Sequence, residues 1–372
     1  MTPRARIITA LRRGQPDRVP VTIYEQSPLN DSWPNREPSY APLLELEGTL
    51  GDPFVWPEFG IPSLLASATP SRSSQTTEAD GTTVTTTELD TPRGPLRWVY
   101  SRAPGLKTAW QMEPAVKTDA DIERVLSLPD PPLGDLPAQV RAVQARVGEQ
   151  GFICFNPGDA IGHVVGLFRF EDFVLRCRRD DGPIMALLER SQHLVLRAIR
   201  ALGGCIREAG FRLWGPEYCG KPLMNPHKYF RRYVVDFDRA ATEAIHATGN
   251  FSIIHCHGML KDLLDMVLEI GADGLEPLEL MPMPTADVTM AEVKERIGGR
   301  MCLMGGVQAV TLENGTPEQM RDEVRACLAA AAPGGGYIVL PTSAPFMVPL
   351  TPQTLANAEA MYRAVHEFGV YA

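Results

Sequence analysis

Residues 251–279 have the sequence FSIIHCHGMLKDLLDMVLEIGADGLEPLE, and this stretch decides the fold. The apolar run at residues 251–254 predicts a buried strand. Apolar residues at helical spacing over residues 259–270 predict a helix, which Gly271 ends. Residues 274–279 predict a second short strand that ends in carboxylates. A strand, a helix and a strand in this order indicate parallel strands joined by a crossover helix.

The same alternation of strand and helix continues through the chain from about residue 137 onward. With a first strand at residues 19–24 and another near residues 52–59, the pattern gives about eight strands, as a barrel of this class has. We therefore expect an α/β fold, specifically a (β/α)8 TIM barrel. The alternative is an open doubly wound sheet. No GxGxxG motif follows a strand, which excludes the usual dinucleotide-binding form of that alternative.

Residues 71–110 differ in composition from the rest of the chain. Thr, Val and aromatic residues predominate there, and Asp80-Gly81 and Arg93-Gly94 stand between the runs as turn signals. The pattern predicts an inserted antiparallel β-meander. We expect a single barrel domain over residues 1–372, with this β-rich segment inserted near the N-terminus.

The bulk composition limits the possible partners. The 372 residues are 44% hydrophobic and 22% charged, which allows a large core and excludes global disorder. A net charge of −9 argues against nucleic acid or an anionic membrane as partner. No apolar run is long enough to span a membrane, and no signal-peptide core begins the sequence. Seven cysteines without a CxxC pair indicate reduced thiols, so we expect a cytoplasmic protein.

Two histidines stand at the end of the 251–257 strand, where the active site of a β/α barrel lies. His255 and His257 share one face, because alternate residues of a strand point the same way, and Cys256 points the opposite way. Gly258 then allows a sharp turn. Two imidazoles and a carboxylate are ligands of a divalent metal, and Glu217, which follows the preceding strand, is the expected third ligand.

Other polar residues at the expected strand ends are candidates by position. The candidates for catalysis are Glu217, Glu279 and Tyr218. The candidates for substrate binding are Glu25, Asn156, Glu276, Gln308 and Ser343. Each has a simpler alternative: a histidine can be hydrogen-bonded in the core, and a carboxylate can pair with Arg or Lys or cap a helix.

The chain resembles the uroporphyrinogen decarboxylase and corrinoid methyltransferase superfamily in several motifs. These are ALRRGQPDRVPV at 10–21, HCHG at 255–258, EIGADG at 269–274, GRMCLMG at 299–305, GTPE at 315–318 and GYIVLP at 336–341. The resemblance includes both ends of the sequence and is concentrated after residue 215. It implies the barrel fold.

Two departures from that superfamily bear on function. The decarboxylases carry an Arg-rich motif after the first strand, where this chain has YEQSPLN at 24–30, so the cations that a tetra-acid porphyrinogen needs are missing there. The zinc methyltransferases carry His-x-Cys-Gly and a later Pro-Gly-Cys. Here His255 matches the histidine, His257 replaces the first cysteine, and Ser343 replaces the second.

The loss of both thiolates favours a harder site, with two histidines, one glutamate and an open position for an oxygen ligand. The resemblance then implies a zinc-dependent methyltransferase of the corrinoid-linked O-demethylase type, which activates a small oxygen-containing methyl donor and uses a corrinoid carried by a partner protein. The alternatives are a decarboxylase-like lyase acting on a small carboxylated substrate, and a non-catalytic barrel that binds a small molecule. A homodimer is compatible with the sequence, which does not determine the oligomeric state.

Overall fold

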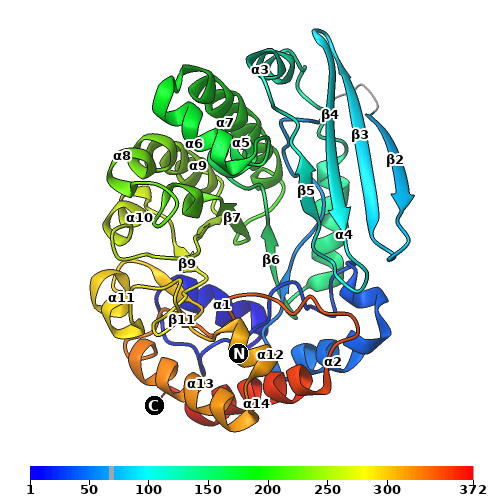
Figure 1. Ribbon diagram of the computed structural model, residues 1–372. Coiled ribbons are helices and arrows are strands. Elements are labelled where there is room, and N and C mark those ends of the chain that lie inside the picture. The colour runs from blue at the N-terminus through cyan, green and yellow to red at the C-terminus, as the bar shows by residue number, and fades with distance from the viewer. Residues whose placement is uncertain (67–70, 372) are drawn as a thin grey trace.

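The computed structural model describes residues 1–66 and 71–371. It contains a curled sheet of seven parallel strands, surrounded by helices, and a separate antiparallel sheet of four strands (Figure 1). Over this part of the chain, no helix combines the length and the apolar character needed to cross a membrane.

The strands of the parallel sheet follow one another in chain order. They are β1 (Phe54–Val55), β6 (Phe152–Phe155), β7 (Gly210–Trp214), β8 (Phe251–His255), β9 (Gly274–Glu276), β10 (Cys302–Met304) and β11 (Tyr337–Ile338). Each is parallel to its neighbours. Sequential strands that lie side by side, each joined to the next by a helical connection, curl the sheet toward a barrel and bring all the C-terminal strand ends to one rim.

A short extended segment lies between the two edge strands and is bonded on both sides. Val21 forms an isolated parallel bridge with Val339, and the amide of Thr22 donates to the carbonyl of Val339 at 3.1 Å. On the other side, the amide of Asp52 donates to the carbonyl of Val21 at 2.7 Å. The predicted first strand is therefore a single bridge. The structure shows the α/β fold with seven parallel strands, and a complete (β/α)8 barrel is not confirmed.

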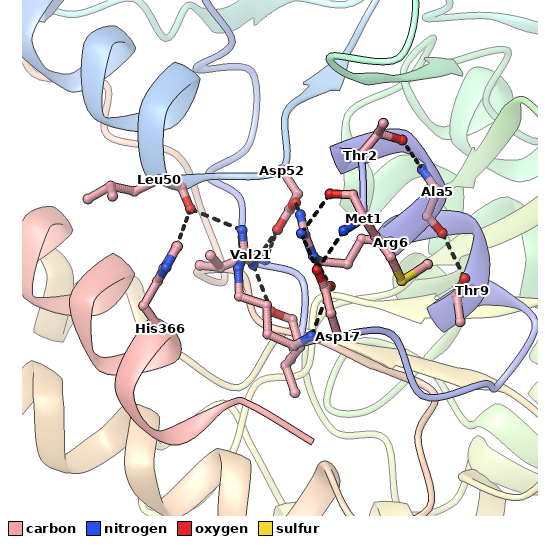
Figure 2. Close-up of polar contacts among 12 residues, drawn as sticks. Met1, Thr2, Ala5, Arg6, Thr9, Asp17, Val21, Leu50, Asp52 and His366 are labelled. Carbon is pink, nitrogen blue, oxygen red and sulfur yellow. Dashed lines mark hydrogen bonds and ion pairs between the residues drawn. The ribbon is translucent and has the colours of Figure 1, made fainter. Parts of the chain in front are cut away.

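Buried ion pairs hold this segment in place. Asp52 is fully buried and accepts hydrogen bonds from Arg6, from Arg18 at 2.6 Å and from the amide of Val21 at 3.0 Å. Arg6 also donates to Asp17 at 2.7 Å. Figure 2 shows Asp52 between the Arg6 side chain and the backbone of Val21. The network joins the first helix, residues 17–21 and the residue that leads into β1.

The helices lie around the sheet (Figure 1). They are α1 (Pro3–Leu11), α2 (Ala41–Leu50), α3 (Asp119–Leu126), α4 (Leu136–Val147), α5 (Ala160–Val165), α6 (Phe170–Arg179), α7 (Gly182–Gly203), α8 (Pro226–Phe230), α9 (Asp236–His246), α10 (Leu264–Ile270), α11 (Met290–Ile297), α12 (Ala309–Asn314), α13 (Pro317–Ala331) and α14 (Pro352–Phe368). Thr118, Thr289 and Thr316 start three of them with capping boxes. The helix predicted from residue 259 begins only at Leu264, because residues 259–263 form a bridge and a turn.

The parallel strands are buried on both faces. Ile253 packs in an inner cluster with Phe152, Met304 and residues of α1, whereas Ile254 packs in the larger cluster under the outer helices. Neither isoleucine is exposed. This double burial is typical of parallel sheets and explains why the strands appear in the sequence as short continuous apolar runs.

The predicted β-meander is present as the antiparallel sheet. Its strands are β2 (Ser71–Thr77), β3 (Thr83–Thr91), β4 (Gly94–Arg102) and β5 (Trp110–Glu113), paired in that order. Leu89 and Leu96 face each other across β3 and β4 and are both buried, whereas every residue of β2 is exposed. Figure 1 shows this sheet beside the helices, in cyan.

Candidate active site

The end of β8 brings the two histidines together at the rim of the parallel sheet. His255 is the last residue of β8 and His257 lies in the turn that follows. Their ring centroids are 4.6 Å apart and the rings are nearly perpendicular, at 83°. His257 is the more accessible, with 35% of its side chain exposed against 12% for His255. This pairing of the rings follows from the alternation of side chains along the strand.

Each imidazole is bonded to a carboxylate that comes from the end of β9. Nδ1 of His255 lies 3.0 Å from Oε1 of Glu276, its register partner in the sheet. Nδ1 of His257 lies 2.8 Å from Oε1 of Glu279. In the His257 pair this contact fixes the ring and leaves Nε2 as the other ring nitrogen. Metal-binding and proton-transferring histidines are commonly oriented in this way. In the His255 pair both ring nitrogens also face Arg212, whose Nη2 lies 2.6 Å from Nδ1 and 3.2 Å from Nε2.

An arginine that the sequence analysis did not select completes this group. Arg212 lies in the middle of β7, with Nε 2.7 Å from Oε1 of Glu276 and Nη2 2.6 Å from Nδ1 of His255. Its guanidinium carbon lies 5.1 Å from the ring centroid of Tyr24 and 5.3 Å from that of Trp56. Arg212 lies within a strand, whereas the site residues expected from the sequence lie at the ends of strands. Side-chain alternation, which puts Arg212 and Trp214 on one face, was the available signal.

Burial determines the protonation of these groups. It lowers the pKa of His255 well below its ordinary value, and the positive charge of Arg212 lowers it further, so this imidazole is neutral. Burial also lowers the pKa of Arg212, to about 10, so the guanidinium remains charged at neutral pH. Burial raises the pKa of Glu25 and of Glu217, and the charge of Arg212 opposes both shifts.

Glu217 lies in the turn directly after β7, next to two buried aspartates. Gly215 allows this turn because its φ is 130° and a Cβ atom there would lie 2.5 Å from Cα of Gly162. Asp159 caps α5 through Oδ1, which accepts from the amide of Gly162 at 2.7 Å. Burial raises the pKa of Asp159 and of Asp238, and their mutual charge repulsion and that with Glu217 add to it. Burial thus raises the pKa of all three carboxyl groups above its ordinary value.

Many buried polar atoms at this rim have no hydrogen-bond partner. Among the residues that the structure describes, they include the Tyr24 hydroxyl, both side-chain atoms of Gln26, Nε1 of Trp56 and Trp214, Oδ1 of Asn156, and one oxygen each of Asp159, Glu217 and Glu276. Buried polar groups in native proteins are nearly always paired. Their concentration at the C-terminal strand ends therefore marks the place where a polar ligand binds.

Three of the predicted residues make no hydrogen bond to either histidine pair within the described part of the chain. Gln308 lines a separate pocket of about 410 Å³ together with several methionines, and its Nε2 donates to the carbonyl of Gly306 at 3.1 Å. The hydroxyl of Ser343 donates to the carbonyl of Ala344 at 3.2 Å. The ring of Tyr218 packs at 6.1 Å from that of Phe170, and burial raises its pKa.

The metal ligand set predicted from the sequence is only partly assembled. Within residues 1–66 and 71–371, no three His, Cys, Asp or Glu side chains are arranged so that they could hold a metal ion. His257 fits a ligand, because it is fixed through Nδ1, whereas Nε2 of His255 lies 3.2 Å from Nη2 of Arg212, which would have to move before His255 could bind a metal. The free Oε2 of Glu217 is the candidate third donor, and its carboxylate is close enough to interact with the charge of His257. Cys256 is fully buried in the outer cluster, on the side away from the histidines.

Comparisons with known proteins agree with the family resemblance. Residues 221–368 match the family model of uroporphyrinogen decarboxylase (URO-D). The predicted resemblance to the uroporphyrinogen decarboxylase superfamily is therefore confirmed, while a place among its corrinoid-dependent members is not. A comparison with curated proteins gave no match.

Solved structures support the same fold. A methyltransferase from Methanosarcina mazei is similar over 99% of this chain and 99% of its own, with a TM-score of 0.62 and 17% sequence identity. A B12-independent methionine synthase from Shewanella sp. W3-18-1 covers 70% of this chain and 72% of its own, with a TM-score of 0.43 and 12% identity. The second likeness is too weak to carry an argument. The first shows that the two proteins share a fold.

Proposed function

We propose that this protein is a metal-dependent methyltransferase, resembling the corrinoid-linked O-demethylase methyltransferases, that activates a small oxygen-containing methyl donor at the rim of the parallel sheet. The observation that carries the proposal is the pair of imidazoles 4.6 Å apart, each bonded through Nδ1 to a carboxylate. The URO-D match and the fold shared with the Methanosarcina mazei methyltransferase support it.

His255 and His257 would supply two ligands of zinc in this enzyme, and Glu217, which does not form a three-ligand cluster with them in the described structure, would have to move to supply the third. The donor set of two imidazole nitrogens and one carboxylate is one that catalytic zinc sites use. The chemistry supplied there would be Lewis acidity toward a substrate oxygen. Because no thiolate belongs to the set, the site suits an oxygen-containing donor better than a thiol.

The other residues of the site orient the reactants and handle the proton. Glu276 contacts the imidazole of His255 and Glu279 contacts that of His257. Arg212, from β7, contacts both Glu276 and His255. A corrinoid on a partner protein would supply the acceptor for the methyl group, and the substrate oxygen would then be left as an alkoxide that keeps the electron pair of the broken bond. Glu25, whose pKa burial raises, is placed near Arg212 and can hold the proton that this alkoxide needs.

Zinc content of the untagged wild-type protein is the first test. We expect about one zinc per chain, lost in His257→Ala and retained in Cys256→Ala, because Cys256 lies on the opposite side of the strand. Both variants should keep the wild-type circular dichroism spectrum. Wild-type protein that neither contains zinc nor binds added zinc would rule out the metal-dependent function.

Formation of methylcobalamin, followed by absorbance, tests methyl transfer when the zinc-loaded protein is mixed with a methyl ether and reduced cobalamin. A second candidate is a lyase acting on a small carboxylated substrate, which the buried Arg212 favours as a partner for a carboxylate. Release of carbon dioxide without any corrinoid would support the lyase. A protein that binds small molecules but turns over neither kind of substrate would fit the non-catalytic alternative.

A further inference from the structure

The guanidinium of Arg212 is held along one edge by hydrogen bonds and is contacted by two neighbouring aromatic rings. Nε and Nη2 are engaged by Glu276 and His255, at 2.7 and 2.6 Å. The rings of Tyr24 and Trp56 lie 5.1 and 5.3 Å from the guanidinium carbon, within the range of cation–π contact. An arginine fixed in this way has lost most of its conformational freedom before any ligand arrives, so binding to it costs little further entropy.

The remaining edge of this guanidinium is free. Nη1 of Arg212 carries two N–H groups and has no hydrogen-bond partner in the described part of the chain, while 11% of the side chain is exposed. Glu25 and Glu217 are near enough for their charges to act on Arg212, but neither is hydrogen-bonded to it. Two donors on a permanent cation therefore remain unused at the rim where the candidate site lies.

The two aromatic residues that contact Arg212 also carry unused donors. Nε1 of Trp56 is buried without a partner, and an indole nitrogen can only donate. The Tyr24 hydroxyl and the amide nitrogen of Gln26 are likewise buried and unpaired. A buried donor without an acceptor costs about 1–3 kcal/mol. A ligand that brings acceptor oxygens to this place would satisfy several of these groups at once.

A purely structural role for Arg212 accounts for only part of this arrangement. Pairing with Glu276 uses Nε, and bracing His255 uses Nη2. These structural contacts leave Nη1 of Arg212 and the indole N–H of Trp56 without a hydrogen-bond acceptor.

We propose that Arg212 is the anion-binding residue of this site and that the substrate is a small carboxylic acid, whose carboxylate accepts from Nη1 of Arg212 and from the donors of Tyr24 and Trp56. The inference rests on the proposed function only in placing the substrate at the strand ends. It requires neither a metal nor methyl transfer. It narrows the methyl donor to one that carries a carboxylate.

Equilibrium binding to chelator-treated full-length protein tests the inference, followed by tryptophan fluorescence and checked by ligand-observed NMR. The probes are methoxyacetate and its neutral amide, methoxyacetamide, which differ mainly in charge. We expect methoxyacetate to bind at least about tenfold more tightly, as one charge-assisted contact predicts. In Arg212→Met this preference should disappear. Because the readout is binding alone, a protein without zinc or methyl transfer can still pass the test.

Matched variants separate binding from folding. Arg178→Met removes an exposed arginine of α6 and should keep the full preference for the anion. Should Arg212→Met not fold, Arg212→Lys serves instead: it keeps the charge, loses the planar donors and is expected to retain only part of the preference. Equal binding of the two probes by wild-type protein, or an unchanged preference in either Arg212 variant, would overturn the inference. Inorganic phosphate binding more tightly than methoxyacetate, with the same dependence on Arg212, would contradict the assignment to a carboxylate.

Discussion

Nδ1 of His257 lies 2.8 Å from Oε1 of Glu279, and the other oxygen of the same carboxylate accepts from the amide of Gly258 at 3.3 Å. Both carboxylate oxygens are thus engaged by the turn that follows β8. Burial acts to raise the pKa of Glu279, but its bond to His257 brings the pKa below the ordinary value. An ionised Glu279 favours the His257 tautomer with the proton on Nδ1, and in that tautomer Nε2 can donate its lone pair to a metal.

Glu279→Gln should therefore weaken zinc binding by about 10- to 100-fold without unfolding the protein. A glutamine can place its amide nitrogen against Nδ1, which favours the tautomer with the proton on Nε2 and blocks ligation there. Competition with a chelator of known zinc affinity measures the change. Glu295→Gln, on the exposed side of α11, is the control and should bind zinc as the wild type does. An unchanged zinc affinity in Glu279→Gln would show that the Glu279 carboxylate does not orient His257 for metal binding.

Gly162→Ala should destabilise the protein by about 2 kcal/mol or more. A Cβ atom at residue 162 would lie 2.4 Å from the carbonyl oxygen of Trp214 and 2.7 Å from its ring, so α5 and the end of β7 would have to separate. Gly299→Ala is the matched control, because nothing lies within 4 Å of its Cβ position, and its effect should stay within about 0.5 kcal/mol. Urea unfolding of both variants makes the comparison, and similar losses of stability would contradict it.

The parts of the fold that could be predicted are those set by local patterns. The apolar run ending at His255 marks a strand, and alternation brings its ring next to that of His257. The antiparallel β-meander could be predicted equally well, because its strands are rich in Thr and other residues that favour exposed β-structure. Both features depend on neighbours in the sequence, and no long-range contact is needed to infer them.

What could not be predicted depends on contacts between distant residues. Arg212 stands inside an ordinary strand pattern, and its importance comes from Glu276, Tyr24 and Trp56, which other segments supply. The sequence pattern at residues 19–24 also predicts a full strand around Val21. The carbonyl and the amide of Val21 are both bonded to Asp52, and Val339 bonds instead to the amide of Thr22 and the carbonyl of Pro20. The segment therefore pairs as a single bridge.

Asp52→Asn should cost about 3–5 kcal/mol of unfolding free energy. Asp52 is fully buried and paired with both Arg6 and Arg18, so the substitution leaves buried positive charge without its counter-charge. Asp17→Asn changes the exposed end of the same network, where 43% of the side chain is accessible, and should cost less than about 1 kcal/mol. Equilibrium urea unfolding at neutral pH measures both, and a comparable loss in the two variants would contradict the buried role of Asp52.

The last prediction concerns Glu47, a fully buried carboxyl of α2 that ties the Val21 segment to α14. It accepts from the Thr22 hydroxyl at 2.6 Å, from the amide of Ile23 at 3.2 Å and from the Tyr362 hydroxyl. No cation is hydrogen-bonded to it among the residues described. Burial raises the pKa of Glu47 from 4.5 to about 8. The folded protein therefore keeps a proton that the unfolded chain loses near pH 4.5.

The sign of the pH dependence follows from this proton. Between pH 4.5 and about 8 the native state binds more protons than the unfolded state, so the contribution of Glu47 to stability is complete below pH 4.5 and is lost as the pH rises to about 8. The loss is on the order of 5 kcal/mol. Glu47→Gln should flatten this part of the stability–pH curve, because an amide can accept from Ile23, donate to the Thr22 hydroxyl and does not titrate. Urea unfolding from pH 5 to 9 measures the slope, with the exposed Glu45→Gln of the same helix as control. A Glu47→Gln curve with the same slope as the wild type and the control would show that Glu47 is ionised in the folded protein throughout this range.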